Sequence, residues 1–462
     1  MIRLLNVYFP ARTVLLGVSE VALVCIAFTM AVIARFGRDA DLVLEDEHGI
    51  YKIALVACIY LLSMYYLDLY DTKVLRNRHE ILTRLLQVVG LGGVILAIVY
   101  YLYPDAQLGR SVLLIGLGVA APLLVLWREA FLWMLNSFDF SEKTLIVGHS
   151  PLALALNREI RTRRELGLDT VGYVDTADGG WTISGLPFLG VLEELADLIT
   201  RHRVTRVIVA MADRRGKLPL DQLLSLKTKG LVVEDGADLY ENVTGKIQLD
   251  ALRPAWLLFS PGFRVSRALL AYKRALSLSV SLICLIAFSP LLVIVAIAVK
   301  LDSKGPAIYR QRRVGKDGKL FFLYKFRTMF DGADANGNHP PAVENDERFT
   351  RIGRWLRRVR IDELPQLYNI LRGDMDFVGP RPFVPDQEKE YARTIPFYAQ
   401  RWTVKPGATG WAQINYGYCA TLADNQEKTA YDLFYIKHIS IGLDLLIIFQ
   451  TIKILVLGRG GR

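Results

Sequence analysis

Residues Ala275–Val299 read ALSLSVSLICLIAFSPLLVIVAIAV, an apolar stretch without a single charge. It is long enough for a membrane-spanning helix, but Ser289 and Pro290 interrupt its middle. The proline removes one helix hydrogen bond, and the serine hydroxyl can satisfy the carbonyl that is freed. Basic residues flank both ends: Arg267, Lys273 and Arg274 before it, Lys300 and Lys304 after it. This pattern is typical of a re-entrant hairpin that enters and leaves by the same face, although an ordinary proline-kinked span is the alternative.

The first 138 residues carry four further apolar stretches, each near the ~20 residues that a spanning helix needs. They are Thr13–Phe36, Ile50–Tyr70, Ile81–Tyr103 and Ser111–Leu135. The first is too long for a cleaved signal peptide and lacks a small-residue cleavage site, so we expect it to be retained. These stretches predict a four-helix transmembrane domain over residues 1–138. With 52% hydrophobic residues and a mean hydropathy of +0.28, the composition also indicates a lipid bilayer as partner.

The distribution of basic residues predicts which side of the membrane each loop faces. Arg3, Arg12, Lys73, Arg76 and Arg78 lie at the N-terminus and in the second loop, whereas the first and third loops carry Arg35, Arg38 and Arg110. The excess favours a cytosolic N-terminus, and four spans then return the chain to the cytosol. We therefore expect a multi-pass protein of the bacterial inner membrane whose catalytic part faces the cytosol.

Residues 139–262 alternate short β-branched segments with helical patterns, which predicts a parallel α/β domain. The strand candidates are Thr144–Val147, Val171–Val174, Val204–Ala210 and Leu231–Val233. The first is followed by GHSPLA at residues 148–153, where a dinucleotide-binding fold carries G-x-G-x-x-G/A. Ser150 replaces the second glycine and Pro151 removes an amide that would face a phosphate. The prediction is a degenerate Rossmann-like domain used for packing, assembly or regulation.

The region after Leu301 is strongly basic, with thirteen lysine or arginine residues between Arg310 and Arg360. The formal charge of +10 fits nucleic acid, anionic lipid or phosphorylated substrates. Beside a membrane segment, such a cluster indicates a lipid-facing surface or a diphosphate site, and no nucleic-acid partner is expected. The final apolar stretch, Ile439–Leu457, is interrupted by Asp444 and Lys453, which predicts an interfacial helix.

Three blocks of the same region combine glycine, proline and charged residues at close spacing. They are LDSKGP (301–306) with YKFRTM (324–329); IDELPQL (361–367) with GDM (373–375) and VGPRP (378–382); and KPGATGWAQ (405–413) with YDLFY (431–435). Together they resemble the bacterial sugar transferase family, the monotopic phosphoglycosyl transferases, over residues 265–462. The preceding spans and Rossmann-like segment are similar to the large branch that initiates exopolysaccharides, and the layout resembles the sugar transferases associated with exosortase systems.

The resemblance implies a mainly α catalytic domain over residues 263–462, including the re-entrant helix, and a two-step reaction. Asp362 and Glu363 match the family's acidic dyad. The aspartate attacks the sugar-linked phosphorus of a UDP-sugar, UMP leaves, and a phosphosugar-aspartate intermediate remains. Polyprenyl (undecaprenyl) phosphate then displaces the aspartate, giving a polyprenyl-diphospho-sugar, the first membrane step of exopolysaccharide or related glycan synthesis.

The chemistry of these residues agrees with that reaction. A carboxylate is a competent nucleophile when the leaving group is good and its charge is neutralised. Mg²⁺ prefers one or two carboxylates plus phosphate oxygens, so Glu363 is the favoured metal ligand, with Asp362 as a second. Taken alone, an acidic pair before Pro365 is more typical of a helix N-terminus, and only the surrounding blocks favour catalysis.

Several other residues are candidates for contacts with the substrate. Arg381 lies between two prolines, whose stiff backbone suits bidentate phosphate binding. Lys325, Arg327 and Arg360 are further candidates for phosphate, and Gln413 is a candidate uridine contact or a packing residue. Trp411 is predicted to pack in the core, and Gly379, Gly407 and Gly410 are predicted to permit tight turns.

Other functions remain open at this level. A conventional glycosyltransferase would release UDP rather than UMP and would need no covalent intermediate. A nucleotide-sugar dehydratase or epimerase would need an intact glycine loop and a Tyr-x-x-x-Lys pair in the middle segment, and neither is present. A transporter or scaffold is suggested only by the four spans, which contain few charges. A homodimer is a further possibility, because membrane and Rossmann-like domains often pair.

Overall fold

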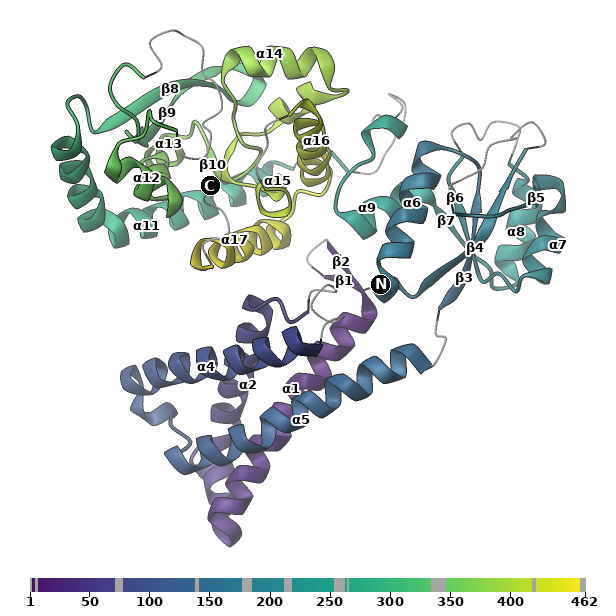
Figure 1. Cartoon of the computed structure of the whole chain (residues 1–462), viewed down its shortest axis with the longest axis horizontal. Coiled ribbons are helices and arrows are strands. Elements are labelled where there is room, and N and C mark those ends of the chain that lie inside the picture. Colours follow the sequence, from purple (N-terminus) through teal and green to yellow (C-terminus); the bar gives the residue numbers. More distant parts are fainter. Residues whose placement is uncertain are drawn as a thin grey trace.

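The computed structural model describes the chain in three regions, which Figure 1 shows as separate bodies. The described residues are 2–4, 7–70, 78–137, 141–176, 185–211, 218–252, 262–263, 266–333, 346–417 and 421–457. Lys73 and Arg76, which the prediction of membrane orientation uses, lie outside them. A short hairpin of β1 (Ile2–Leu4) and β2 (Val7–Phe9) precedes the first long helix.

Several apolar helices follow near the N-terminus. They are α1 (Ala11–Phe36), α2 (Gly49–Tyr66), α4 (Arg78–Leu102) and α5 (Arg110–Ser137). Each of the four is long and apolar enough to cross a membrane. They coincide with the four apolar stretches of the sequence, and α2 ends before Tyr70 because the chain leaves the helix at Leu67.

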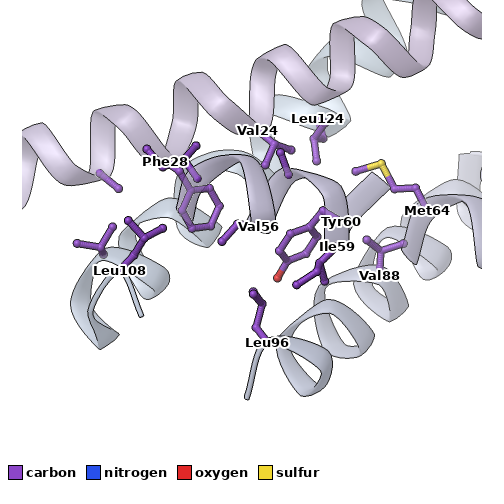
Figure 2. Close-up of a cluster of buried hydrophobic side chains, with 14 of the residues drawn as sticks. Val24, Phe28, Val56, Ile59, Tyr60, Met64, Val88, Leu96, Leu108 and Leu124 are labelled. Carbon is purple, nitrogen blue, oxygen red and sulfur yellow. The ribbon is translucent and has the colours of Figure 1, made fainter. Parts of the chain in front are cut away.

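The four helices share one buried core, to which each contributes apolar side chains (Figure 2). Phe28 of α1 and Tyr60 of α2 are among its largest members. One ion pair is also enclosed: Arg128 of α5 donates to both carboxylate oxygens of Glu20 on α1, at 2.5 and 3.1 Å. Both side chains are almost fully buried. Such a pair fixes the register of α1 against α5, because shifting either helix would leave a charge unpaired in an apolar environment.

The middle region contains one parallel sheet in the order β5-β4-β3-β6-β7. Its strands are β3 (Glu142–Val147), β4 (Leu168–Asp175), β5 (Phe188–Val191), β6 (Arg206–Val209) and β7 (Val232–Asp235). Its helices are α6 (Pro151–Thr162), α7 (Leu195–Arg201), α8 (Leu220–Thr228) and α9 (Gly236–Thr244). Along β3, Ile146 packs with α6 and α9, while Leu145 and Val147 pack with α7 and α8. The predicted α/β domain with four strands is confirmed, and β5 is a fifth strand that the sequence did not indicate.

The strand order is that of a Rossmann sheet, whose ligand crevice would open between β3 and β6. Here Ser150 closes that point: its hydroxyl donates to the carbonyl of Ala210, at 2.5 Å, and accepts from the amide of Ala153. The amide of His149, which would face a pyrophosphate, instead donates to Asp175 Oδ2 at 3.0 Å. These polar groups of the turn are thus bonded to the protein itself, which agrees with a degenerate dinucleotide-binding fold.

The third region begins with α11 (Arg267–Asp302), which continues through Pro290. Ser289 Oγ donates to the carbonyl of Ile286 at 2.8 Å, the group that a residue other than proline at position 290 would have bonded. The predicted compensation by serine is therefore present. The helix is long and apolar enough to cross a membrane, and only 11% of its most apolar 18-residue stretch is buried in the protein.

Both ends of α11 contact the same third region. Near its start, buried Lys273 donates to Asp444 at 2.9 Å and to the hydroxyl of Tyr435 at 2.5 Å. At its end, Asp302 accepts the backbone N–H of Ile352 at 3.0 Å. Figure 1 shows α11 on the same side of this region as α12 and α13.

The rest of the third region is mainly helical and contains two small sheets. Antiparallel β8 (Ile308–Val314) and β9 (Leu320–Phe326) form one, and parallel β10 (Asp376–Val378) and β11 (Gly407–Thr409) form the other. The helices are α12 (Arg351–Arg358), α13 (Gln366–Arg372), α14 (Pro385–Thr394), α15 (Trp411–Asn415), α16 (Leu422–Lys437) and α17 (Ile441–Val456).

The middle region docks on α16 and α15. Buried Lys437 of α16 donates to both oxygens of Glu241 on α9, at 2.8 and 3.0 Å. Trp411 stacks on Phe434 and donates its indole N–H to the carbonyl of Gly245 at 2.6 Å. The prediction that Trp411 packs in the core is confirmed. This interface therefore connects the Rossmann-like sheet to the helix that also carries Gln413.

Candidate active site

Asp362 lies in a short 3-10 turn, Ile361–Glu363, that joins α12 to α13. Arg360 immediately before it adopts a left-handed conformation, with φ 61°, which reverses the chain at the end of α12. Non-glycine residues rarely adopt this conformation, and it persists only where the surrounding structure holds it. The turn buries Asp362, leaving it 6% exposed, and its Oδ1 has no hydrogen-bond partner among the described residues.

Glu363, its neighbour, is surrounded by cations. Its Oε1 accepts from Lys325 Nζ at 2.9 Å and from Arg381 Nη2 at 3.0 Å. A third cation, Arg360, lies 3.8 Å away. Lys325 reaches this point from β9, and Arg381 reaches it from the loop after β10. The two carboxylates of the dyad therefore have different environments, one paired and the other without a partner at Oδ1.

The electrostatics follow from this difference. Burial raises the pKa of Asp362 to about 6, with Lys325 opposing the shift and the charge of Glu363 adding to it. Burial also acts on Glu363, but Lys325, Arg381 and Arg360 bring its pKa well below the ordinary value. At neutral pH Glu363 is thus a fixed anion that positions the cations. Asp362 is also mainly ionised, and it is the less stabilised carboxylate of the two.

The loop that carries Arg381 is fixed by close backbone contacts. Gly379 donates its N–H to Thr409, and Gly407 donates to Pro380, both at 2.9 Å. A Cβ on Gly407 would lie 2.0 Å from the nitrogen of Gly379. The sequence predicted that these glycines permit tight turns, but neither Gly379 nor Gly407 has a positive φ. Both positions instead require glycine because a Cβ would collide with the neighbouring backbone.

A buried arginine supports the same loop from behind. Arg401 donates to the carbonyl of Arg381 at 2.8 Å and to Asp432 at 2.8 Å. It also donates to the hydroxyl of Tyr398 at 2.6 Å, and Glu388 lies 3.6 Å away. This network orients the chain at Arg381 without reaching the dyad.

Sequence reasoning missed Arg313 as a site residue. Its guanidinium donates to the carbonyl of Pro382 at 3.1 Å and to Gln311 at 2.6 Å, while its buried Nε has no partner among the described residues. Burial, together with the charge of Arg381, lowers the pKa of Arg313 to about 10. Side chains alternate along a strand, so Tyr309, Gln311 and Arg313 share the cavity-facing side of β8. That alternation was the signal that could have identified Arg313.

Arg327 and Gln413 have other roles besides facing the cavity. Arg327 donates to the carbonyl of Ser303 at 2.7 Å and to its hydroxyl at 2.8 Å, which caps the C-terminal end of α11. Its Nε and Nη1 are buried without a described partner. Gln413 donates to the carbonyl of Ala408 at 3.2 Å, and its Oε1 is likewise buried without a partner.

A cavity of about 1580 Å³ lies at the acidic dyad. Every residue that the sequence predicted for the site is on its wall: Asp362, Glu363, Arg381, Lys325, Arg327, Arg360 and Gln413. Among the described lining residues, nine lysine or arginine side chains face four carboxylates. This excess of positive charge fits an anionic substrate such as a diphosphate.

The cavity offers few ligands for a metal. Among the described residues, no group of three or more histidine, cysteine, aspartate or glutamate side chains is close enough to hold an ion. Mg²⁺ commonly takes only one or two protein carboxylates and completes its shell with water and substrate phosphates. Asp362 and Glu363 are the two carboxylates that could serve.

Comparison with known proteins identifies the catalytic region. The family model described as bacterial sugar transferase matches residues 268–458, and one described as a CoA-binding domain matches residues 66–219. The glucose-1-phosphate transferase of Escherichia coli K12, named as acting on UDP-glucose and undecaprenyl phosphate, is 33% identical over 69% of this chain and 69% of its own length. The chain therefore belongs to the bacterial sugar transferase family.

Two further relatives differ in the extent of the match. The N-acetylgalactosaminephosphotransferase of Aeromonas hydrophila, named for UDP-N-acetylgalactosamine and undecaprenyl phosphate, is 40% identical over 48% of this chain. The match spans only about half, 52%, of that relative. The exopolysaccharide production protein PSS of Rhizobium leguminosarum is 42% identical over 40% of this chain and 94% of its own length. This relative thus covers less than half of the present chain, although nearly its whole length is matched.

We predict that Arg381→Lys lowers kcat/KM for the sugar donor about tenfold or more. A lysine retains the charge but cannot reproduce the planar pair of N–H donors, and one lost charge-assisted hydrogen bond has roughly this effect. Steady-state kinetics of the purified protein measure the change. Arg372→Lys is the matched control, because Arg372 is largely exposed, 56% for its side chain. Equal kcat/KM for the two variants would contradict the assignment of Arg381.

Proposed function

We propose that this protein transfers a sugar 1-phosphate from a UDP-sugar to polyprenyl phosphate, releasing UMP through a phosphosugar–Asp362 intermediate. The supporting observation is the buried Asp362 Oδ1, which has no described partner and faces a cavity rich in cations. Such an oxygen is not stabilised by donors that it would have to lose before attacking. The names of the relatives, which include undecaprenyl phosphate and UDP-sugars, agree with these substrates.

In the first half-reaction, an oxygen of Asp362 attacks the phosphorus that bears the sugar. The new P–O bond forms as the bond between that phosphorus and the bridging oxygen breaks, and the electron pair leaves with UMP. Lys325 and Arg381, which Glu363 holds in place at 2.9 and 3.0 Å, neutralise the charge that develops on the leaving phosphate.

In the second half-reaction, a phosphate oxygen of the polyprenyl phosphate attacks the same phosphorus. The bond to Asp362 breaks and restores its carboxylate, and the product is a polyprenyl-diphospho-sugar. UMP and this product balance the two substrates without a net proton. The reaction would be the first membrane step of an exopolysaccharide or a related glycan.

A conventional glycosyltransferase is the alternative. It would break the bond between the sugar and the diphosphate, release UDP and need no carboxylate bonded to phosphorus. A buried carboxylate without a partner at one oxygen beside three cations supports the phosphorus-directed reaction instead. The nucleotide released distinguishes the two reactions directly.

We predict that Asp362→Asn abolishes turnover and also the exchange of labelled UMP into UDP-sugar in the absence of acceptor. The amide has the same shape but cannot attack phosphorus. The wild-type protein, incubated with donor alone, should gain the mass of one phosphosugar at Asp362. Asp386→Asn, a change at an exposed aspartate of α14, serves as the control and should exchange normally. Substantial exchange by the Asp362 variant would rule out the proposed nucleophile.

We also propose that Mg²⁺ assists the first half-reaction, held by Glu363 and Asp362 together with the donor diphosphate. When bound, the ion supplies neutralisation of charge on the leaving UMP. Lys325 and Arg381 already bind Glu363, so a divalent cation is disfavoured there until the diphosphate brings negative charge. The residues therefore fit an ion that arrives with the donor.

Removal of Mg²⁺ should consequently abolish turnover, and its return should restore it. Calorimetry of the chelator-treated protein should detect saturable Mg²⁺ binding with UDP present and none at sub-millimolar Mg²⁺ without it. The physical reason is the repulsion between Mg²⁺ and the cations around Glu363. Full activity in the presence of a chelator would contradict the proposal, and tight Mg²⁺ binding without nucleotide would contradict the order.

The contacts of α11 support a re-entrant hairpin rather than a span. Arg274, near its start, donates to the carbonyl of Ile370 on α13, at 2.5 Å. Val299, near its end, packs with Leu356 on α12. Because α12 and α13 are joined by only seven residues, 359–365, both ends of α11 contact neighbouring elements of one region, which supports entry and exit by the same face. We propose that both ends lie on the cytosolic face of the inner membrane.

A cysteine or epitope tag inserted after Leu301 should therefore be accessible only from the cytosol. Labelling of intact cells and of inverted membrane vesicles with an impermeant reagent measures this. A tag in the loop before Gly49, between α1 and α2, is the matched control and should have the opposite accessibility. Labelling of the Leu301 site in intact cells would refute the hairpin.

A further inference from the structure

The catalytic cavity extends beyond the catalytic region to the N-terminal helices. Tyr65 and Asp68, at the cytosolic end of α2 in the proposed orientation, are part of its wall. The wall also contains Cys284 and Phe288 of α11 and Leu455 of α17. Phe288 and Leu455 are exposed and apolar. The cavity therefore combines the polar groups around Asp362 with apolar side chains from α11 and α17.

One cation lies in the wall between α17 and α2. Lys453 Nζ is 2.5 Å from Asp68 Oδ1, donates to the carbonyl of Tyr65 at 2.6 Å and lies 4.3 Å from the centre of the Tyr65 ring. Its side chain is 15% exposed. An ammonium has three donors, so one remains for a ligand in the cavity without the loss of either contact.

The position of Asp68 is specified by the surrounding structure. It adopts a left-handed conformation with φ 55°, just after α2 ends, and Arg84 of α4 lies 3.6 Å from its second oxygen. Phe449 of α17 packs against the rings of Tyr65 and Tyr66, with centroids 5.3 and 5.5 Å apart. The contact between α2 and α17 is thus built from both apolar and charged groups.

We propose that Lys453, oriented by Asp68 and Tyr65 of the N-terminal helices, binds the phosphate of the lipid acceptor, whose first isoprene units lie against Phe288 and Leu455. The proposal rests on the proposed function, because it assigns the acceptor subsite of that reaction. The phosphomonoester of the acceptor carries about −1.5 to −2 charges at neutral pH. A cation beside an apolar wall would therefore stabilise this head group while the isoprene chain stays in the apolar environment.

Other cations of the cavity are less suited to this role. Lys325 and Arg381 bind Glu363 and are required by the donor diphosphate. Arg327 caps the end of α11. Lys453 is the described lysine of α17 that adjoins the apolar wall, and its helix is tied to the active-site strand β11 by a 2.6 Å hydrogen bond between Thr451 and Thr409.

Tyr65 of α2 and Asp68 just after it touch Lys453 rather than the acidic dyad. They therefore contribute to the wall of the cavity and not to the reacting centre. We expect Asp68 and Tyr65 to tune acceptor binding, and we expect the loss of Lys453 to change acceptor KM rather than the chemistry at Asp362.

The test separates the two half-reactions of the full-length protein in detergent or nanodiscs. Lys453→Met should raise the KM for undecaprenyl phosphate about tenfold, as expected for one lost charge-assisted hydrogen bond. Its UMP exchange without acceptor should stay within about twofold of wild type, which also shows that the variant is folded. Lys453→Arg should restore most of the acceptor affinity. Asp68→Asn, which keeps an acceptor oxygen but removes the competing charge, should have a KM equal to or below wild type.

Lys246→Met is the matched control, because Lys246 joins two regions through Glu427 but does not line the cavity. Its acceptor KM should not change. An unchanged acceptor KM in Lys453→Met would overturn the proposal. An equal rise of the acceptor KM in Asp68→Asn would also overturn it, because it would indicate that Lys453 serves only to hold α17 against α2. Acceptor KM is measured from lipid product, so this result stands even if wild-type protein shows no UMP exchange. That separate outcome would refute the covalent mechanism.

Discussion

The carboxylate of Glu363 connects three segments that are far apart in the sequence: β9 through Lys325, the loop after β10 through Arg381, and the turn that carries Asp362. Removing Glu363 would leave two partly buried cations without their shared counter-ion. Glu363 therefore fixes both cations relative to its neighbour. Glu363 accepts their hydrogen bonds, whereas Asp362 Oδ1 has no partner among the described residues. Burial raises the pKa of Asp362 to about 6. The two adjacent carboxylates thus have different environments, one paired with cations and one with an oxygen that no described donor reaches.

The sequence predicted the features that depend on chemistry within a few residues. Ser289 satisfies the carbonyl that Pro290 leaves free because both groups lie within one helical turn. The four apolar helices and most of the parallel sheet follow from periodicity alone. The residues of the site were predicted from the family blocks, and they line one cavity. The role of Gly379 and Gly407 was misjudged because close contact between two backbones depends on tertiary packing, which local turn preference does not report.

Contacts between distant charges were not predictable in the same way. Glu241 and Lys437 are 196 positions apart, and each residue type alone indicates an exposed surface. Asp68 and Lys453 likewise meet only because α2 and α17 pack together. The first pair is buried at the contact between the α/β sheet region and the catalytic region, and the second is partly buried at the contact between α2 and α17. Each ionic pair would lose its partner if the two regions separated.

The cavity has both polar and apolar lining residues, and this combination gives a physical reason for the proposed covalent intermediate. In the proposed reaction the donor would be a water-soluble diphosphate bound by the cations around Glu363, and the acceptor would be a lipid lying against Phe288 and Leu455. If both bound at once, two phosphate groups would compete for the same positive charge and repel each other. In the proposed mechanism, a phosphosugar held on Asp362 would let UMP leave before the lipid phosphate approaches. A single nucleophile would then separate the two anions in time, while the charge of Glu363 would keep Lys325 and Arg381 in place for both.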